Sequence, residues 1–413
     1  MRIAFLAYNR DPSIPHIDND GCPVTVRYYA LELGKLGHEI DIFTNKVSPN
    51  TRSSNYLKEK FVAQAKDTVS LEKNVKVIRI PAKNFSTNNT FLPKELAEIP
   101  EIAESFSNAG FFEDEKLHSY DAVCFFHPLS SFGPLVLGYV LTKNSVLFPM
   151  LLSDEYKKYQ SVSKIYEEFE DFSLKTVRSV FACSTYEQEL ILAKGVDATS
   201  VEVVHRGFDN SIYTHRQRNL PTDLQKVRII SIGSIKPQKQ QLQLIEVAKI
   251  LKGDGYNPQI TIVGENRKFI KNEYESYYKL ILKEIKSAGL EQSFIFTGAL
   301  GPDEIAALLK ENDLGVYCSV GESFGKAALE SICSGLPTIL NTKVDAYRDF
   351  AKDGVNALFY DSTAPSCTKM IERILKNENL YRNISEGGRE TAISFSWKNV
   401  SLQLEAALKE IRK

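Results

Sequence analysis

The sequence contains no cysteine framework, no long hydrophobic run and no excess of charge of either sign, and each absence excludes a class of protein. Its six cysteines are scattered through 413 residues and include no Cys-x-x-Cys pair. This distribution is typical of reduced thiols in a cytosolic protein and argues against a disulfide framework or a zinc site. Because the net charge is −1, we expect no nucleic-acid partner. A local basic patch is the one route to nucleic-acid binding that the net charge does not address.

No segment has the apolar length that crossing a membrane requires. The apolar stretch Met1–Tyr8 is too short for the core of a signal peptide and meets a charged loop, so we predict a buried first strand. Lys58, Lys60 and Lys66 could form a membrane-facing patch, although a solvated helix face is the simpler interpretation. We therefore expect a cytoplasmic protein with at most peripheral contact at the inner face of a membrane.

A chain of 413 residues is too long for one core and suits two domains of about 200 residues each. Short apolar runs alternate with helix-like segments, first in Met1–Tyr8, Val24–Leu36 and Ile40–Phe43. Such alternation predicts parallel sheets covered by helices, with ligands at the carboxyl ends of the strands. The polar, proline-containing segment Thr214–Lys226 is typical of a linker. The predicted bounds are a first domain at 1–213, a linker at 214–226, a second domain at 227–395 and a C-terminal helix at 396–413.

The stretch Ser319–Pro337 places a strand end, a glycine turn and a helix start in one run. Gly321 and Gly325 permit a tight turn, and Lys326–Ser334 is predicted to be a helix. The free amides and positive dipole end of such a helix start favour a phosphate. We therefore expect a diphosphate over Phe324, Gly325 and Lys326.

Two carboxylates flank this helix start. Glu322 lies just before the helix and Glu330 eight residues later, roughly 12 Å of helical rise if all were helix. A carboxylate can accept two hydrogen bonds from sugar hydroxyls, so the pair matches the reach of a nucleotide-sugar. Alternatively, Glu322 is an N-terminal charge favoured by the dipole and Glu330 a solvated helix residue. Taken singly, neither glutamate decides between these interpretations.

Together, Glu-Ser-Phe-Gly-x-x-x-x-Glu and the later Gly-Leu-Pro resemble the Glu-x7-Glu signature of retaining glycosyltransferases of the GT-B fold, most closely family 4 (glycosyl transferases group 1). The resemblance covers nearly the whole chain. It implies an α/β protein with two Rossmann-like, doubly wound domains facing each other across a cleft. It also implies that Glu322 holds the transferred sugar, that Glu330 holds the ribose, and that the amides of Phe324 and Gly325 contact sugar and phosphate. Ser323 and Lys326 belong to the same donor-binding run.

The loop Gly233–Lys239 resembles the family loop that supplies cations to the donor diphosphate. Ser234 stands where arginine is frequent, and Lys236 is a candidate to compensate for it. Lys239 is the expected phosphate lysine. Since the dipole disfavours lysine at a helix start, its position implies a nearby anion.

In the first domain, Gly21-Cys22-Pro23 and the turn Leu36–Ile40 resemble the Gly-Gly loop and Gly-His-Glu-Val turn of the family, so Gly21 is expected near the diphosphate. Asp18-Asn19-Asp20 mimics a metal-binding Asp-x-Asp motif. Because the main motif of the chain belongs to a metal-independent class, we expect no metal and no other cofactor.

His127 follows an apolar run, at a place where the family has a histidine near the primary hydroxyl of the sugar or the acceptor. A lone histidine in such a turn can equally be structural. Arg206 occupies the place of the Pro-x-Gly-Val-Asp motif of the family, where it either approaches the diphosphate or is an exposed loop arginine.

The resemblance implies a retaining hexosyltransferase that moves a hexose-type sugar from a UDP- or GDP-sugar to an acceptor hydroxyl. Lys239, Glu322 and His127 are the expected catalytic residues. The acceptor, which can be a small molecule, a glycan or a lipid-linked sugar, is expected on the N-terminal domain at 47–112. Two alternatives stay open: a degenerate nucleotide-sugar-binding protein, suggested by Asp20, Ser234 and the altered segment Met150–Asp154, and a phosphorylase or epimerase of the same fold.

Overall fold

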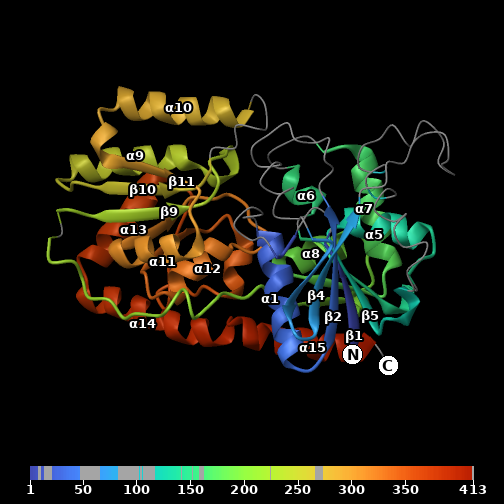
Figure 1. Ribbon diagram of the computed structural model, residues 1–413. Coiled ribbons are helices and arrows are strands. Elements are labelled where there is room, and N and C mark those ends of the chain that lie inside the picture. Colours follow the sequence, from blue (N-terminus) through green and yellow to red (C-terminus); the bar gives the residue numbers. More distant parts are fainter. Residues whose placement is uncertain are drawn as a thin grey trace. The chain divides into compact units, whose positions relative to one another are not determined.

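The computed structural model describes residues 1–7, 11–13, 21–46, 66–81, 102, 105, 117–140, 142–150, 152–157, 162–223, 225–265 and 273–411. The chain divides into two compact units, which are considered separately (Figure 1). The first consists of Met1–Arg206 and Trp397–Lys413, and the second of Gly207–Ser396. Lys58, Lys60 and the motif Asp18–Asp20 lie outside the described residues, as does most of the expected acceptor-binding stretch.

The described part of the first unit contains an eight-stranded sheet with the order β3-β4-β2-β1-β5-β6-β7-β8. Its pairs are parallel except β3 with β4, which is antiparallel. The central strands are buried on both faces, which explains their continuous apolar sequences. The strands are β1 (Arg2–Leu6), β2 (Glu39–Lys46), β3 (Thr68–Glu72), β4 (Val75–Pro81), β5 (Ala122–Phe126), β6 (Ser145–Phe148), β7 (Ser179–Ala182) and β8 (Val201–Val203).

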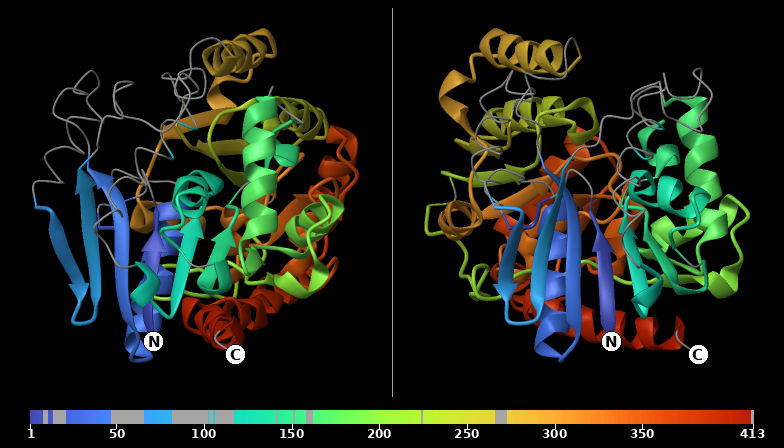
Figure 2. Two further views of the ribbon diagram at one scale, coloured as in Figure 1. Left: turned by 90° about the vertical axis from the view of Figure 1, so that its right-hand side faces the viewer. Right: turned by 45° about the vertical axis from the view of Figure 1, so that its right-hand side comes forward.

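Helices cover this sheet, and the last of them comes from the C-terminus of the chain (Figure 2). The helices are α1 (Gly21–Lys35), α5 (Pro128–Val136), α6 (Ser153–Tyr156), α7 (Lys164–Thr176), α8 (Thr185–Ala193) and α15 (Trp397–Ile411), with short 3-10 turns η3 (Leu117–Ser119), η4 (Thr142–Asn144) and η5 (Ala198–Ser200). Trp397 stacks on Tyr28 with ring centroids 5.1 Å apart and meets Tyr29 edge-on at 5.4 Å. These aromatic contacts attach α15 to α1.

The second unit contains a six-stranded parallel sheet with the order β11-β10-β9-β12-β13-β14. This is the doubly wound Rossmann order, in which the chain direction across the sheet reverses between β9 and β12 and ligands bind at the carboxyl ends of those two strands. The strands are β9 (Arg228–Ile232), β10 (Gln259–Val263), β11 (Phe294–Gly298), β12 (Leu314–Tyr317), β13 (Thr338–Asn341) and β14 (Leu358–Tyr360).

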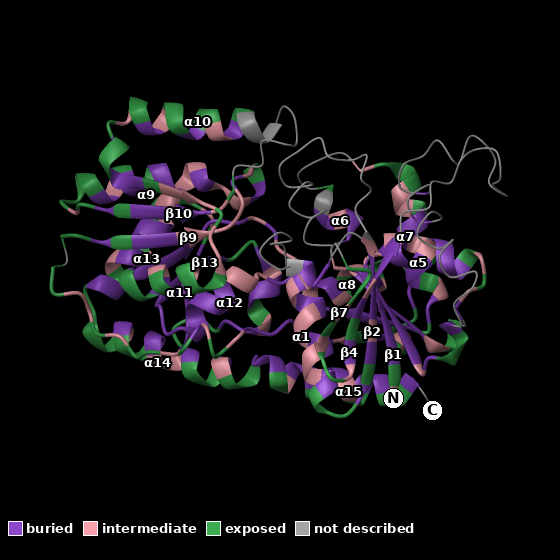
Figure 3. Ribbon diagram, viewed as in Figure 1, coloured by how far each residue is buried: buried purple, intermediate pink, exposed green. Residues whose placement is uncertain are grey.

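The helices of this unit pack over a continuous apolar core, in which β10 is buried after its first residue (Figure 3). They are α9 (Gln241–Gly253), α10 (Glu273–Ser287), α11 (Pro302–Glu311), α12 (Lys326–Cys333), α13 (Ala364–Leu375) and α14 (Glu378–Ser394), with 3-10 turns η6 (Pro237–Lys239), η7 (Glu291–Ser293) and η8 (Asp345–Asp349). In the described parts of both units, no helix combines the length and apolar character needed to span a bilayer.

Candidate functional site

Two loops leave the same edge of the second sheet, one after β9 and one after β12. The strands pair in parallel, with Leu314 opposite Ile229, so their carboxyl ends lie together. Hydrogen bonds then join the loops: the amide of Val320 donates to the carbonyl of Gln238 at 3.0 Å, and Nε2 of Gln238 donates to the carbonyl of Gly321 at 2.6 Å. The sequence interpretation did not identify Gln238, because nothing local indicates a partner so distant in the chain.

Lys239 and Glu322 form an ion pair between these two loops, from Nζ to Oε1. The same Oε1 accepts a hydrogen bond from Oγ of Ser319 at 2.8 Å. The side chains of Lys239 and Glu322 are only 17% and 16% exposed. Lys239 lies in the loop expected at Gly233–Lys239, where it ends η6 two residues before α9 begins at Gln241. The anion that its position implied is, in this structure, the carboxylate of Glu322.

The pKa of Glu322 is held below its usual value. Burial by itself would raise this pKa, but the charge and hydrogen bond of Lys239, the hydroxyl of Ser319 and the charge of Lys236 outweigh burial. Both contacts with Lys239 and Ser319 use Oε1, and within the described part of the chain no group donates to Oε2. Glu322 is therefore an ionised carboxylate with one oxygen able to accept hydrogen bonds from hydroxyl groups.

The turn before α12 is supported by aromatic rings. Gly325 has φ of 92°, and a Cβ there would lie 2.3 Å from Cε1 of Tyr347, so only glycine fits. The ring of Phe324 is buried and packs against Phe350, with centroids 5.5 Å apart. Only the backbone of Phe324 can therefore contact a ligand. The support fixes the start of α12 at Lys326. The amides of Ala328 and Leu329 donate to the carbonyl of Gly325, whereas those of Lys326 and Ala327 have no acceptor within the described residues.

Glu330 lies one turn into α12 and is buried, with a side chain only 6% exposed. Its Oε1 pairs with Nζ of Lys326. The interpretation of Glu330 as a solvated helix residue is therefore wrong, because α12 packs with this face inward. Tyr317 at the end of β12 holds the helix there, since its hydroxyl donates to the carbonyl of Ala327 at 3.0 Å.

Ser234 and Lys236, two further expected residues of this unit, lie on the β9 loop, and Ser323 lies between Glu322 and Phe324 before α12. The carbonyl of Ser234 accepts a hydrogen bond from Nε2 of Gln241 at 3.0 Å, which ties the loop to the start of α9. Lys236 caps η6, and its charge acts on the carboxyl of Glu322. The structure thus brings Lys236, Lys239 and Glu322 together.

His127 and Gly21 belong to the first unit. His127 follows β5, has φ of 96° and caps α5, where its Nδ1 accepts from the amide of Leu129 at 3.2 Å. Its Nε2 lies 3.3 Å from the hydroxyl of Tyr166. These contacts give His127 a structural role in the turn and leave its catalytic role a prediction. Gly21 is the first residue of α1.

Arg206 is buried rather than exposed, so the exposed-arginine interpretation is wrong. Its Nη2 donates to the carbonyl of Met150 at 2.8 Å. Burial by itself would lower the pKa of Arg206, but nearby groups, first Cys183 and then Glu187, raise it overall. Arg206 therefore fixes the backbone after β6, in the segment that departs from the family pattern.

The family of the chain follows from comparison with known proteins. Residues 214–391 match the family described as glycosyl transferases group 1, and residues 20–207 match the glycosyl transferase 4-like domain. The chain belongs to the group 1 glycosyltransferases. It is 24% identical over 434 residues to a D-inositol 3-phosphate glycosyltransferase of Corynebacterium glutamicum, covering 98% of this chain and 96% of that protein. It is 23% identical over 431 residues to a mannosylfructose-phosphate synthase of Agrobacterium fabrum, covering 96% and 87%.

Solved glycosyltransferase structures show the same fold. Sucrose-phosphate synthase from Thermosynechococcus elongatus aligns with a TM-score of 0.77 at 18% identity, covering 100% of this chain and 99% of that one. Anabaena Alr3699/HepE, solved in complex with UDP and glucose, aligns with a TM-score of 0.69 at 15% identity, covering 99% and 100%. The expected GT-B class is therefore confirmed.

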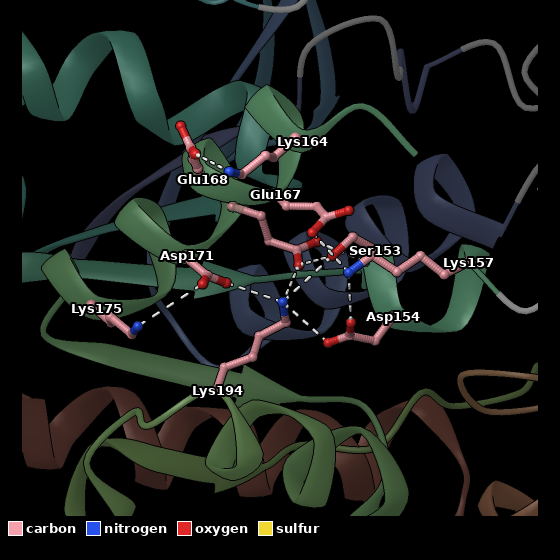
Figure 4. Close-up of polar contacts among 10 residues, drawn as sticks. Ser153, Asp154, Lys157, Lys164, Glu167, Glu168, Asp171, Lys175 and Lys194 are labelled. Carbon is pink, nitrogen blue, oxygen red and sulfur yellow. Dashed lines mark hydrogen bonds and ion pairs between the residues drawn. The ribbon is translucent and has the colours of Figure 1, made fainter. Parts of the chain in front are cut away.

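A second polar cluster lies in the first unit of this glycosyltransferase and joins α6, α7 and α8 (Figure 4). Nζ of Lys194 lies 3.1 Å from Asp154, 3.1 Å from Glu170 and 3.0 Å from Asp171. Glu170 is fully buried and also accepts from the amide and hydroxyl of Ser153, at 2.9 and 2.6 Å. The side chains of this polar cluster come from three separate segments of the chain, so the sequence alone did not indicate the cluster. Over the described residues, no group of three or more histidine, cysteine, aspartate or glutamate side chains could hold a metal ion.

The lowered pKa of Glu322 predicts how the stability of this glycosyltransferase depends on pH. A carboxyl whose folded pKa lies below its unfolded value of 4.5 stabilises the fold above that value, and loses this contribution as pH falls through the folded pKa. We expect Glu322→Gln to cost about 1–2 kcal/mol at pH 7, roughly 2–8 °C in thermal midpoint. The difference from wild type should narrow as the pH is lowered below 4.5, in thermal unfolding followed across a pH series. A difference in thermal midpoint between Glu322→Gln and wild type that grows as the pH falls would contradict the lowered pKa of Glu322.

Proposed function

We propose that this glycosyltransferase transfers a hexose-type sugar from a UDP- or GDP-sugar to an acceptor hydroxyl with retention of anomeric configuration. The Lys239–Glu322 pair beside the free amides of α12 carries this proposal. It combines a cation for a diphosphate with a carboxylate for sugar hydroxyls at the carboxyl ends of β9 and β12. By their names, one relative is a glycosyltransferase for D-inositol 3-phosphate and another a synthase of mannosylfructose phosphate, and one similar structure holds UDP and glucose.

In the proposed reaction, the bond between the anomeric carbon and the diphosphate breaks while a bond from the acceptor oxygen forms on the same face. The leaving diphosphate gains negative charge, which Lys239 and the first-turn amides of α12 stabilise. A leaving phosphate oxygen takes the proton of the acceptor hydroxyl, so no side chain acts as a strong base. Because these protein groups supply the positive charge, the reaction needs no metal.

Two carboxylates orient the donor in this proposal. Oε2 of Glu322 accepts hydrogen bonds from the transferred sugar, and Lys239 keeps this carboxylate ionised. Glu330 binds the ribose hydroxyls, and Lys326 holds its carboxylate in position. In the first unit, Gly21 and Arg206 are proposed to contact the donor diphosphate. His127 is proposed to contact the primary hydroxyl of the sugar or the acceptor.

A thermal-shift panel of UDP- and GDP-sugars tests the proposal. A donor present at 100 times its dissociation constant should stabilise the protein by about 2.7 kcal/mol. We expect a shift with one nucleotide class, unchanged by EDTA and abolished by Glu330→Ala. The matched control is Glu372→Ala, which breaks a surface pair with Lys376 at the same helical spacing and should preserve the shift.

The absence of a shift with every donor would contradict the proposed donor site. If one donor does stabilise the protein, its hydrolysis in the absence of an acceptor distinguishes an enzyme from a protein that only binds the donor. A protein that binds the donor but never cleaves it, with any acceptor, would be the nucleotide-sugar-binding alternative.

A further inference from the structure

A basic hollow of about 550 Å³ lies in the second unit, lined among others by Arg216, Arg218, Lys226, Arg228, Lys310 and Asp313. Arg228 opens β9, and Asp313 directly precedes β12. The hollow is therefore at the amino ends of these parallel strands, whereas Lys239 and Glu322 follow their carboxyl ends. The four residues of β12 separate the two places by roughly 13 Å of strand, so the hollow is distinct from the proposed donor site.

Two arginines form fixed walls of the hollow. The guanidinium of Arg218 donates to the carbonyls of Leu309 at 2.6 Å and Asn312 at 2.8 Å, at the C-terminal end of α11. Arg228 makes a two-pronged contact with Asp313, with distances of 3.1 Å from Nε to Oδ2 and 2.7 Å from Nη2 to Oδ1. Such planar contacts hold both side chains in one orientation.

The backbone that carries Arg216 is also fixed. Its amide donates to the carbonyl of Ser334 at 3.2 Å, and the amide of Arg218 donates to Oγ of Ser385 at 2.9 Å. Gly335, with φ of 78°, lies so close that a Cβ there would be 2.2 Å from the carbonyl oxygen of Arg216. Arg216 therefore projects from a segment that needs no reordering before it binds a ligand.

The hollow has more positive than negative charge. Arg216 and Lys310 are exposed, and within the described part of the chain neither forms an ion pair with a carboxylate. Lys226 has only a 4.0 Å contact with Asp223. Burial lowers the pKa of Arg218, and the charges of Arg216 and Arg228 lower it further, against the opposing effects of Tyr381 and Asp313. An anion would relieve this repulsion between like charges.

We propose that the basic hollow binds a small phosphorylated anion, with Arg216 and Lys310 as its direct ligands. Its volume falls within the range of small-molecule sites, and its cations line a concave surface rather than a long stripe, which favours a small ligand over a polymer. A surface whose cations contacted only solvent would not require a fixed backbone at Arg216 or fixed side-chain orientations for Arg218 and Arg228. The proposal is independent of the proposed donor specificity.

Calorimetric titration with inorganic pyrophosphate tests this site. The titrations use full-length protein carrying Lys239→Ala, so that the proposed donor site contributes little heat. We expect Arg216→Ala with Lys310→Ala to weaken pyrophosphate binding about tenfold or more. The matched control, Lys283→Ala with Arg382→Ala, removes the same charge from exposed positions on α10 and α14 and should leave the affinity within about twofold.

Equal weakening in both double variants, or no binding above background, would overturn the proposal. A second measurement separates small anions from lipid headgroups: co-sedimentation with phosphatidylglycerol vesicles should be the same for the hollow variant and its control. If vesicle binding rather than pyrophosphate binding depended on Arg216 and Lys310, the hollow would be a membrane contact and the proposal would be wrong. Folding of each variant is checked by its thermal midpoint.

Discussion

Replacing Lys239 with alanine should lower kcat by about 10²- to 10³-fold, as expected when one preorganised group that stabilises developing charge is lost. Lys239 stands between the two loops at the carboxyl ends of β9 and β12 and is largely shielded from water. It contacts the carboxylate of Glu322, so its removal has two effects. The leaving diphosphate loses a cation, and Glu322 loses the charge that most strongly lowers its pKa.

The measurement is steady-state transfer with the donor identified by thermal shift, with kcat and KM determined separately. The matched control is Lys249→Ala on α9, which breaks a surface pair with Glu246 and should leave kcat within about twofold. A Lys239→Ala enzyme with wild-type kcat and a raised KM would show that Lys239 only binds the donor. Unchanged kinetics would remove Lys239 from the site.

The second large effect is structural. Replacing Arg79 with methionine should destabilise the first unit by about 3–5 kcal/mol, because it removes the guanidinium that compensates the buried negative charge of Asp11. Nε of Arg79 on β4 lies 2.9 Å from Oδ2 of Asp11, and the side chains are 2% and 0% exposed. Arg79 also donates to Oγ of Ser13 at 2.8 Å. These contacts attach Asp11 and Ser13, which lie between β1 and α1 in the sequence, to the sheet.

Unfolding in urea measures this loss. Arg2→Met is the matched control. Arg2 on β1 of the same sheet pairs with Asp41 at 3.2 Å but is 46% exposed, so its loss should cost less than about 1 kcal/mol. The double variant Asp11→Ala with Arg79→Met should be less destabilised than the sum of the single variants, because no unpaired charge stays buried. Similar losses for Arg79→Met and Arg2→Met would contradict this account.

Much of the fold could be predicted from local patterns. The helix expected at Lys326–Ser334 is α12, the first strand expected within Met1–Tyr8 is β1, and the helix-like segment Val24–Leu36 lies in α1 as far as Lys35. Serine is a common helix cap, and Oγ of Ser184 accepts a hydrogen bond from the amide of Glu187 at 3.0 Å at the start of α8. Apolar periodicity, helix caps and glycines that end helices depend on residues only a few positions apart, so these features can be predicted from the sequence directly.

The candidate site could be predicted only in part. The motif from Glu322 to Glu330 is local and was found, together with the glycine turn at Gly325. The position of Lys239 at the end of η6 was not foreseen, because the sequence signals for a 3-10 turn and for the first turn of a helix overlap. The burial of Arg206 was also missed, since exposure depends on which segments cover a loop.

The sequence by itself therefore determined many elements of this glycosyltransferase, the alternation that yields two largely parallel sheets, and the donor motif at the start of α12. Only the tertiary structure decided which distant residues meet. Lys239 and Glu322 are 83 positions apart and pair because β9 and β12 are neighbours in the sheet. Arg79 and Asp11 are 68 apart, and the basic hollow collects residues from Arg216 to Tyr381. Such contacts depend on strand order and packing, which no short-range pattern of side chains specifies.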